Sequence, residues 1–258
     1  GLVAASIAAG TAQAANGNPN SPAKMVKAVK AENVLKHLEA FQAIADDHDG
    51  HRAAGTSGYE ASAQYVEKQL NAAGYTPERQ YFDFVFEQVH DTSLTEISPD
   101  QRAVDNNPMS YSQGTGPEGV TGTLTQPAAD VLGCTSAAYG GANLEGQIAL
   151  VSRGACAFAD KAAAAYQVGA EAVIVYNNAA GALNGTLGGV NPQSAPATGI
   201  TQAEGQALLA KMANGPVTMS FVLDKTLENR QTFNVIAETK TGRADNVVAI
   251  SRQGTRSR

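Results

Sequence analysis

The stretch GQIALVSRGACAFADKAAAAYQVGAEAVIVYNN, residues 146–178, carries the clearest structural signal in the chain. The apolar run at 148–152 predicts a strand, the alanine-rich segment at 158–168 predicts a helix, and the uninterrupted apolar run at 172–176 predicts a buried strand. Strand, helix and strand in this order predict a βαβ unit with parallel strands. This part of the protein is therefore expected to have an α/β fold.

Two amphipathic helices are predicted upstream of this unit. Residues 31–45 and 57–73 each place apolar side chains at helical spacing. Ser57 and Glu60 have the spacing of a capping box, and Gly74 suits the position just after a helix. The alternating segments that follow, at 76–89 and 92–98, predict strands.

Three further patterns describe the rest of the chain. The piece GTGPEG at 114–119 matches G-x-G-x-x-G, but no helix follows it to hold a pyrophosphate, so it is interpreted as a turn. Thr201 and Glu204 predict a capped helix, followed by a strand at 217–223. The segments 233–242 and 246–251 predict a terminal hairpin.

Composition narrows the function classes. The chain has 258 residues and a formal net charge of −6, with a sequence pI near 5.2. An acidic chain without a basic surface argues against a nucleic-acid partner. The hydrophobic content of 43% is that of a globular protein, long enough for one large or two ordinary domains.

The N-terminus predicts export. A run of small apolar residues leads to Ala12-Gln13-Ala14, an A-x-A cleavage pattern, and residues 1–23 are interpreted as a signal-peptide remnant and linker. The run is too short to span a bilayer, so no membrane span is expected in the mature chain. In an oxidising compartment Cys134 and Cys156 would form one disulfide, whereas in the cytosol they would be separate thiols.

The hexapeptide DDHDGH at 46–51 is the densest group of metal-ligating side chains in the sequence. Its two histidines, His48 and His51, are candidates for a metal site. The alternative is a solvated turn between two helices, which Gly50 favours. Neither a nucleophile elbow nor a phosphate-binding loop is present. His37 is interpreted as a half-buried helix residue and His90 as a turn residue.

The segment HLEAFQAIADDHDGHRAAGTSGYEASAQYVEKQLNAAGY, residues 37–75, resembles the N-terminal signature of secreted two-zinc aminopeptidases, the family that includes aminopeptidase Y. The matching features include Arg52, Gly55-Thr56 and Gly58-Tyr59. In that family the loop before the arginine is not a zinc site. The resemblance therefore implies that DDHDGH is a variation of a connecting loop, and no metal ligand is assigned.

The middle of the chain resembles the protease-associated (PA) domain inserted in many of these enzymes. The resemblance is carried by Gly133-Cys134, by residues 150–178 and by the stretch PATGITQAEGQALLA at 196–210. It implies that Cys134 and Cys156 pair. A PA domain is non-catalytic, and it implies a peptide or protein as a partner.

The segment FNVIAETKTGRADNVVAIS at 233–251 resembles the return into the peptidase domain, where a His-x-Asp motif with the first zinc ligands follows. Here SRQGTRSR follows instead, and a truncated or frame-shifted sequence is the preferred interpretation. The expected fold is α/β: a partial α/β/α aminopeptidase domain with an inserted, β-rich PA domain that contains the βαβ unit. The expected parts are 24–98 (first peptidase elements), 99–226 (PA domain) and 227–258 (return to the peptidase domain).

The resemblance implies the N-terminal and PA-domain portion of a secreted zinc-dependent aminopeptidase, which hydrolyses N-terminal peptide bonds. Two zinc ions are implied for the full-length family. In this chain we expect no catalytic residue, no metal ligand and no cofactor, and so no activity by itself. One alternative is a stand-alone secreted PA-type module that binds peptides or proteins. Another is a PA insert of a subtilisin-type protease, against which the helices at 31–75 argue.

Overall fold

The structure is a computed structural model that describes residues 22–240. The predicted signal-peptide residues 1–21 and the second strand of the predicted hairpin, 246–251, lie outside the described residues. The described residues divide into two compact units, one formed by residues 22–81 and 232–240 and the other by residues 82–231. The bounds predicted from the sequence for the inserted domain, residues 99–226, stay a prediction. We describe each unit by itself.

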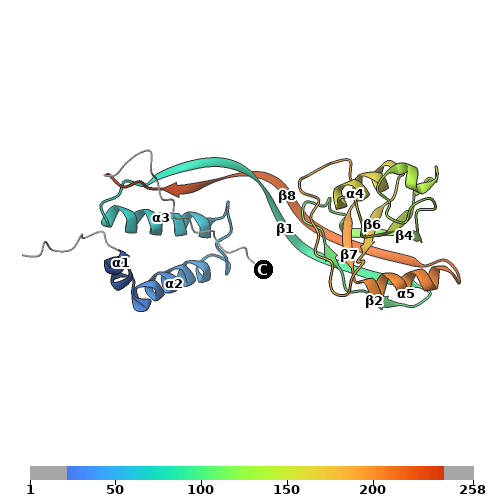
Figure 1. Cartoon of the computed structure of the whole chain (residues 1–258), viewed down its shortest axis with the longest axis horizontal. Helices are drawn as coiled ribbons and strands as arrows, with labels where there is room; N and C mark the ends of the chain where they lie inside the picture. The colour runs from blue at the N-terminus through green and yellow to red at the C-terminus, as the bar shows by residue number, and fades with distance from the viewer. Residues whose placement is uncertain (1–21, 241–258) are drawn as a thin grey trace, which may run out of the picture. The chain divides into compact units, whose positions relative to one another are not determined.

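Helices dominate the first unit. They are α1 (Pro22–Ala28), α2 (Ala31–Asp46) and α3 (Ser57–Ala72), and α2 packs against α3 (Figure 1). Helix α3 stops where predicted, because Gly74 adopts a left-handed conformation with φ of 86°. The helices predicted at 31–45 and 57–73 are both present.

The described residues form one eight-stranded mixed sheet in the order β2-β1-β8-β4-β5-β6-β7-β3. Strands β4, β5, β6 and β7 are parallel, whereas β8 is antiparallel to β4 and β3 is antiparallel to β7. The strand bounds are β1 (Glu78–Ser98), β2 (Arg102–Ala103), β3 (Asn107–Pro108), β4 (Gly116–Thr125), β5 (Gln147–Ser152), β6 (Ala172–Tyr176), β7 (Ala197–Ile200) and β8 (Thr218–Ile236).

Two helices cover opposite faces of the parallel strands in the second unit. Helix α4 (Phe158–Gln167) buries its alanines with Val173 and Val175 in one apolar cluster. Helix α5 (Gln202–Met212) buries Leu208 with Ile174 in the other. Successive residues of β6 thus enter different clusters, as the pleat of a strand requires. The parallel βαβ unit predicted from residues 146–178 is confirmed, and this unit has a core on both faces.

The strands predicted at 76–89 and 92–98 are both present, joined as a single long strand, β1. Two local expectations were wrong. The piece GTGPEG enters β4 with a bulge, and the backbone of Phe221 comes so close to Gly119 that an added Cβ would lie 2.7 Å from its carbonyl oxygen. The Ser57/Glu60 capping box does not form, because Thr56 takes the N-cap position and the Glu60 carboxylate binds Arg79 instead.

Candidate functional site

The loop DDHDGH forms the turn between α2 and α3. Asp49 and Gly50 adopt left-handed conformations, with φ of 56° and 76°. His48 Nδ1 lies 3.0 Å from the hydroxyl of Ser57, while His51 Nδ1 is buried without a hydrogen-bond partner. Through residues 22–240, no group of three or more His, Cys, Asp and Glu side chains is placed to hold a metal ion.

The other two histidines also contact hydroxyl groups. His37 Nδ1 lies 2.7 Å from Tyr65 Oη, and His90 Nε2 lies 2.8 Å from Thr226 Oγ1. Zinc sites need histidine, cysteine or carboxylate donors that converge on one point. The described residues therefore do not fit the zinc pair that the family resemblance implies.

A charged cluster joins α3 to the adjoining strand ends within the first unit. Arg79 donates hydrogen bonds to the carboxylates of Glu60 and Glu67, and its guanidinium lies 4.3 Å from the centre of the Phe233 ring. Hydrogen bonding to Arg79 lowers the pKa of Glu60, and the two carboxylates raise the pKa of Arg79. The hydroxyl of Tyr59 donates to the carbonyl oxygen of Phe233. These contacts fix α3 against β1 and β8.

One face of α2 is apolar and exposed. Val34, Leu35 and Leu38 are 45%, 53% and 45% exposed, and with Val29, Ala31 and Glu32 they line a shallow hollow. We call these six residues the α2 face. The apolar stripe predicted for this helix is present, and these side chains stay largely uncovered by the described residues. An exposed apolar patch of this kind marks an interaction surface.

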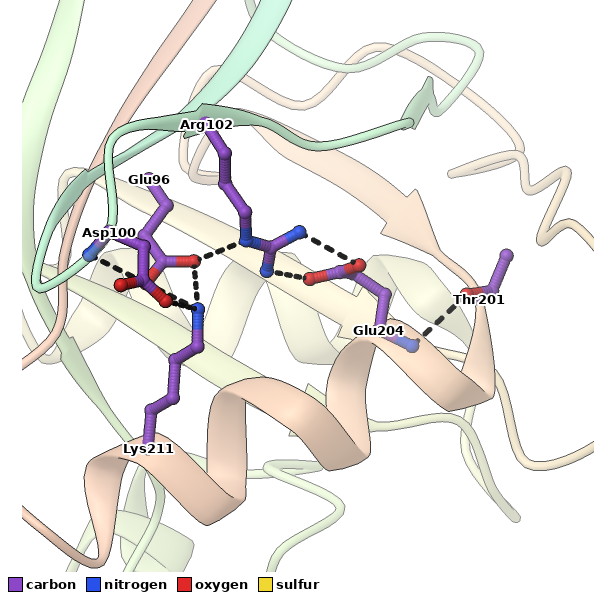
Figure 2. Close-up of polar contacts among 6 residues, drawn as sticks. All are labelled: Glu96, Asp100, Arg102, Thr201, Glu204 and Lys211. Atoms are coloured by element: carbon purple, nitrogen blue, oxygen red, sulfur yellow. Dashed lines mark hydrogen bonds and ion pairs between the residues drawn. The ribbon is translucent and has the colours of Figure 1, made fainter.

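A buried ion-pair network links α5 to β1 and β2 in the second unit (Figure 2). The side chain of Glu96 is 0% exposed, and its carboxylate accepts hydrogen bonds from Arg102 and Lys211. Arg102 also binds Glu204, and Lys211 also pairs with Asp100 at 2.8 Å. The Lys211 ammonium lowers the pKa of Asp100. Its charged side chains pair with one another and tie α5 to β1 and β2, so we assign the network to fixing α5.

The predicted disulfide is confirmed: Cys134 and Cys156 are bonded, with Cα atoms 5.9 Å apart. Beside it, the Lys161 side chain of α4 is fully buried and its ammonium donates to the carbonyl oxygen of Leu132. Burial lowers the pKa of Lys161, while the charges of Asp130 and Asp160 oppose that shift. Sequence patterns showed Lys161 only as part of the family resemblance, and gave no sign that it is buried.

Comparison with known proteins identifies the second unit. Residues 120–208 match the family model described as PA domain. The chain is 38% identical over 204 residues to probable leucine aminopeptidase 2 of Aspergillus fumigatus, which covers 77% of this chain and 38% of that protein. It is 36% identical over 222 residues to probable lipoprotein aminopeptidase LpqL of Mycobacterium tuberculosis, which covers 85% of this chain and 43% of that protein.

The solved structures that this chain resembles are also aminopeptidases. The aminopeptidase from Aneurinibacillus sp. strain AM-1 matches with a TM-score of 0.66 and 32% identity, over 86% of this chain and 51% of that chain. The zinc aminopeptidase BSAP from Bacillus subtilis matches with a TM-score of 0.54 and 26% identity, over 83% and 48%. The chain spans about two fifths of the length of the curated relatives named above. None of the helices within residues 22–240 is long and apolar enough to cross a membrane.

Proposed function

We propose that this chain, which carries a PA domain and is related to M28-type zinc aminopeptidases, supplies the PA domain and two outer helices of a secreted zinc-dependent aminopeptidase. Such an enzyme hydrolyses N-terminal peptide bonds. The metal ligands and the catalytic base come from residues other than 22–240. The PA domain takes part in binding a peptide or protein substrate, and the chain alone has no aminopeptidase activity.

The uncovered α2 face carries this proposal. Among residues 22–81 and 232–240, the buried hydrophobic side chains are Ala45, Ala63 and Phe233. Two alanines and one phenylalanine are far too small a core for a unit of this size to be stable alone. A helix with an exposed apolar stripe is stable when another layer covers that stripe. The α2 face is thus one side of a larger core.

The length of the relatives supports an occupant for the α2 face. They are more than twice as long as the part that this chain matches, and they are named as aminopeptidases. The remainder of such an enzyme is the occupant that we assign to the face: an apolar sheet surface that packs on Val34, Leu35 and Leu38. The polar sides of α2 and α3 stay in water.

A complementation experiment tests this proposal. The full 258-residue chain is co-expressed with the part of the Aneurinibacillus aminopeptidase that lies outside its match to this chain. We expect the two to copurify, and we expect leucine p-nitroanilide to be hydrolysed in a chelator-sensitive way only when both are present. Chelator-sensitive hydrolysis by the 258-residue chain alone would contradict the assignment of the ligands to other residues. Failure of the two parts to associate would contradict the assigned occupant.

A second candidate function is a stand-alone secreted module that binds peptides or proteins. It is favoured by the second unit, whose apolar clusters on both faces of the sheet give it a core of its own. The two candidate functions differ in the role of the first unit, because in a stand-alone module no catalytic domain packs on the α2 face. Peptide binding by residues 82–231 that is unaffected by changes in α2, together with failed complementation, would favour this second candidate.

A further inference from the structure

We propose that the Cys134–Cys156 disulfide is a directional site of thiol–disulfide exchange. An incoming thiolate attacks Cys156 Sγ, and Cys134 leaves as a thiolate beside the ammonium of Lys161. The substrate class is a small thiol or a protein dithiol. This inference does not depend on the proposed aminopeptidase function, because it rests on the PA domain alone.

The position of Lys161 distinguishes the two sulfur atoms. Its Nζ lies 4.0 Å from Cys134 Sγ, and the whole side chain is buried. In low-dielectric surroundings a full positive charge at this distance strongly stabilises a thiolate. Burial lowers the pKa of Lys161, while the charges of Asp130 and Asp160 oppose that shift and favour the ammonium form. Tyr139, which borders Gly133 of the same loop, stays neutral because burial raises its pKa to about 12.

The other sulfur has a weaker stabilising influence. Cys156 lies just before α4, whose N-terminus acts as about half of an elementary positive charge. The Asp160 carboxylate partly neutralises this positive helix end, because it accepts a hydrogen bond of 3.2 Å from the amide of Ala157. The negative charge of Asp160 also disfavours a thiolate nearby. A full charge next to Cys134 therefore outweighs a partly neutralised helix end next to Cys156.

Access favours attack at Cys156. This residue is partly exposed and stands between Ala155 and Ala157, two exposed residues with small side chains. Cys134 is also partly exposed, but one side of its sulfur faces the buried Lys161. We therefore expect an external thiolate to attack Cys156 Sγ, with Cys134 Sγ as the leaving group.

The loop that carries Cys134 does not depend on the disulfide for its position. The amide of Leu132 donates to the Asp130 carboxylate at 3.0 Å, and the amide of Gly133 donates to the Asp130 carbonyl oxygen at 3.0 Å. The amide of Ser152 donates to the carbonyl oxygen of Val131 at 2.8 Å. Together with the Lys161 bond to Leu132, these contacts keep Cys134 beside the ammonium after the S–S bond breaks.

The exchange balances in atoms and electrons. The sulfur of the incoming thiolate forms a bond to Cys156 Sγ, the Sγ–Sγ bond breaks, and its electron pair remains on Cys134 Sγ. A monothiol such as glutathione stops at this mixed disulfide. When the reagent is a dithiol, its second thiolate then attacks its first sulfur, which is bonded to Cys156 Sγ. The dithiol closes into a disulfide and Cys156 leaves as a thiolate, so that two electrons pass from the dithiol to the protein.

The test is to treat the native 258-residue chain with glutathione, quench with acid, alkylate free thiols and locate both modifications by mass spectrometry. We expect glutathione on Cys156 and the alkyl group on Cys134, with a bias of roughly tenfold or more. Lys161→Met should abolish the bias, Lys161→Arg should restore part of it, and Lys36→Met is the matched control that should leave it unchanged. Glutathione chiefly on Cys134, or equally on both cysteines, would overturn the proposal.

A second measurement needs no variant, in case Lys161→Met does not fold. The fully reduced wild-type chain is alkylated with iodoacetamide across a range of pH under native conditions, and each cysteine is followed separately. We expect the rate for Cys134 to rise at lower pH than the rate for Cys156. Identical profiles, or the reverse order, would show that Lys161 does not control the chemistry of the disulfide and would reject the proposal.

Discussion

The ammonium of Lys211 lies 2.7 Å from both carboxylate oxygens of Glu96, although the two residues are far apart in the sequence (Figure 2). Glu96 points into the second unit from β1, next to the cluster that contains Leu94, whereas Lys211 extends from the last turn of α5. A buried carboxylate needs such a partner, because leaving it unpaired in the interior is costly. The pair therefore makes the docking of α5 against β1 specific.

Removing the charge of Glu96 should destabilise the protein. In Glu96→Gln, Arg102 and Lys211 lose their shared carboxylate, but both are partly exposed and can regain water. We expect a loss of about 2–3 kcal/mol in the free energy of unfolding, below the usual value for a fully buried pair. Urea denaturation measures it, with the exposed Glu118→Gln as control. A change below about 0.5 kcal/mol would show that the network does not fix α5.

Acid should weaken the first unit through Glu60. Because Arg79 lowers the pKa of this carboxyl in the folded protein, the stabilisation is present above the ordinary value of 4.5 and is lost as the pH falls through the lower folded value. We expect stability to fall below about pH 4.5, less steeply in Glu60→Gln. Because Glu60 is partly exposed, added salt should reduce the effect. Equal slopes in the two proteins at low salt would contradict this prediction.

Local sequence signals predicted the parts of the fold that depend on near neighbours. The βαβ unit followed from the apolar runs of β5 and β6 and the alanines of α4, and the end of α3 followed from Gly74. The Glu96 network could not be predicted, because Glu96 in a strand resembles an ordinary solvent-facing residue until the tertiary fold brings Arg102 and Lys211 to it. The capping box at Ser57 failed for the same reason: Arg79, from another element, takes the Glu60 carboxylate.

For the α2 face, the sequence predicted the apolar stripe but could not predict which part of a protein covers it. The spacing of Val34, Leu35 and Leu38 correctly predicted an apolar stripe, but no pattern in α2 states what covers it. The buried Lys161 is a related case, since a lysine on an amphipathic helix usually faces solvent. Only its hydrogen bond to Leu132 and the nearby disulfide explain its burial.

Removing the disulfide should destabilise the PA domain. The cysteines are 22 positions apart, and closing a loop of this length restricts the unfolded chain by about 3 kcal/mol. We expect Cys134→Ala/Cys156→Ala to lose about this amount, as measured by thermal or urea unfolding of the wild type and variant without reductant. In the presence of reductant the wild type should approach the variant. A variant as stable as the oxidised wild type would show that the disulfide does not stabilise the folded PA domain.

The α2 face predicts a substitution that separates folding from association. Leu35 is 53% exposed, so Leu35→Lys should change the stability of the 258-residue chain by no more than about 0.5 kcal/mol. The same substitution would bury an unpaired ammonium when the remainder of an aminopeptidase packs on the face, which is strongly unfavourable. We therefore expect it to abolish copurification and restored activity in the complementation experiment.

The matched control for this prediction is Lys36→Gln, next to Leu35 in α2. Residue 36 is exposed and is not among the residues that line the α2 face, and successive helix residues point in directions about 100° apart. We expect Lys36→Gln to associate and complement like the wild type. If Leu35→Lys complemented as well as Lys36→Gln, the occupant of the α2 face would not be the rest of the catalytic domain. If instead Leu35→Lys unfolded the chain alone, the stripe would already be covered within it. The exposure of Leu35 predicts that Leu35→Lys keeps the stability of the chain alone, and the small core of the first unit predicts that it loses association. Only a stable variant that fails to associate agrees with both arguments.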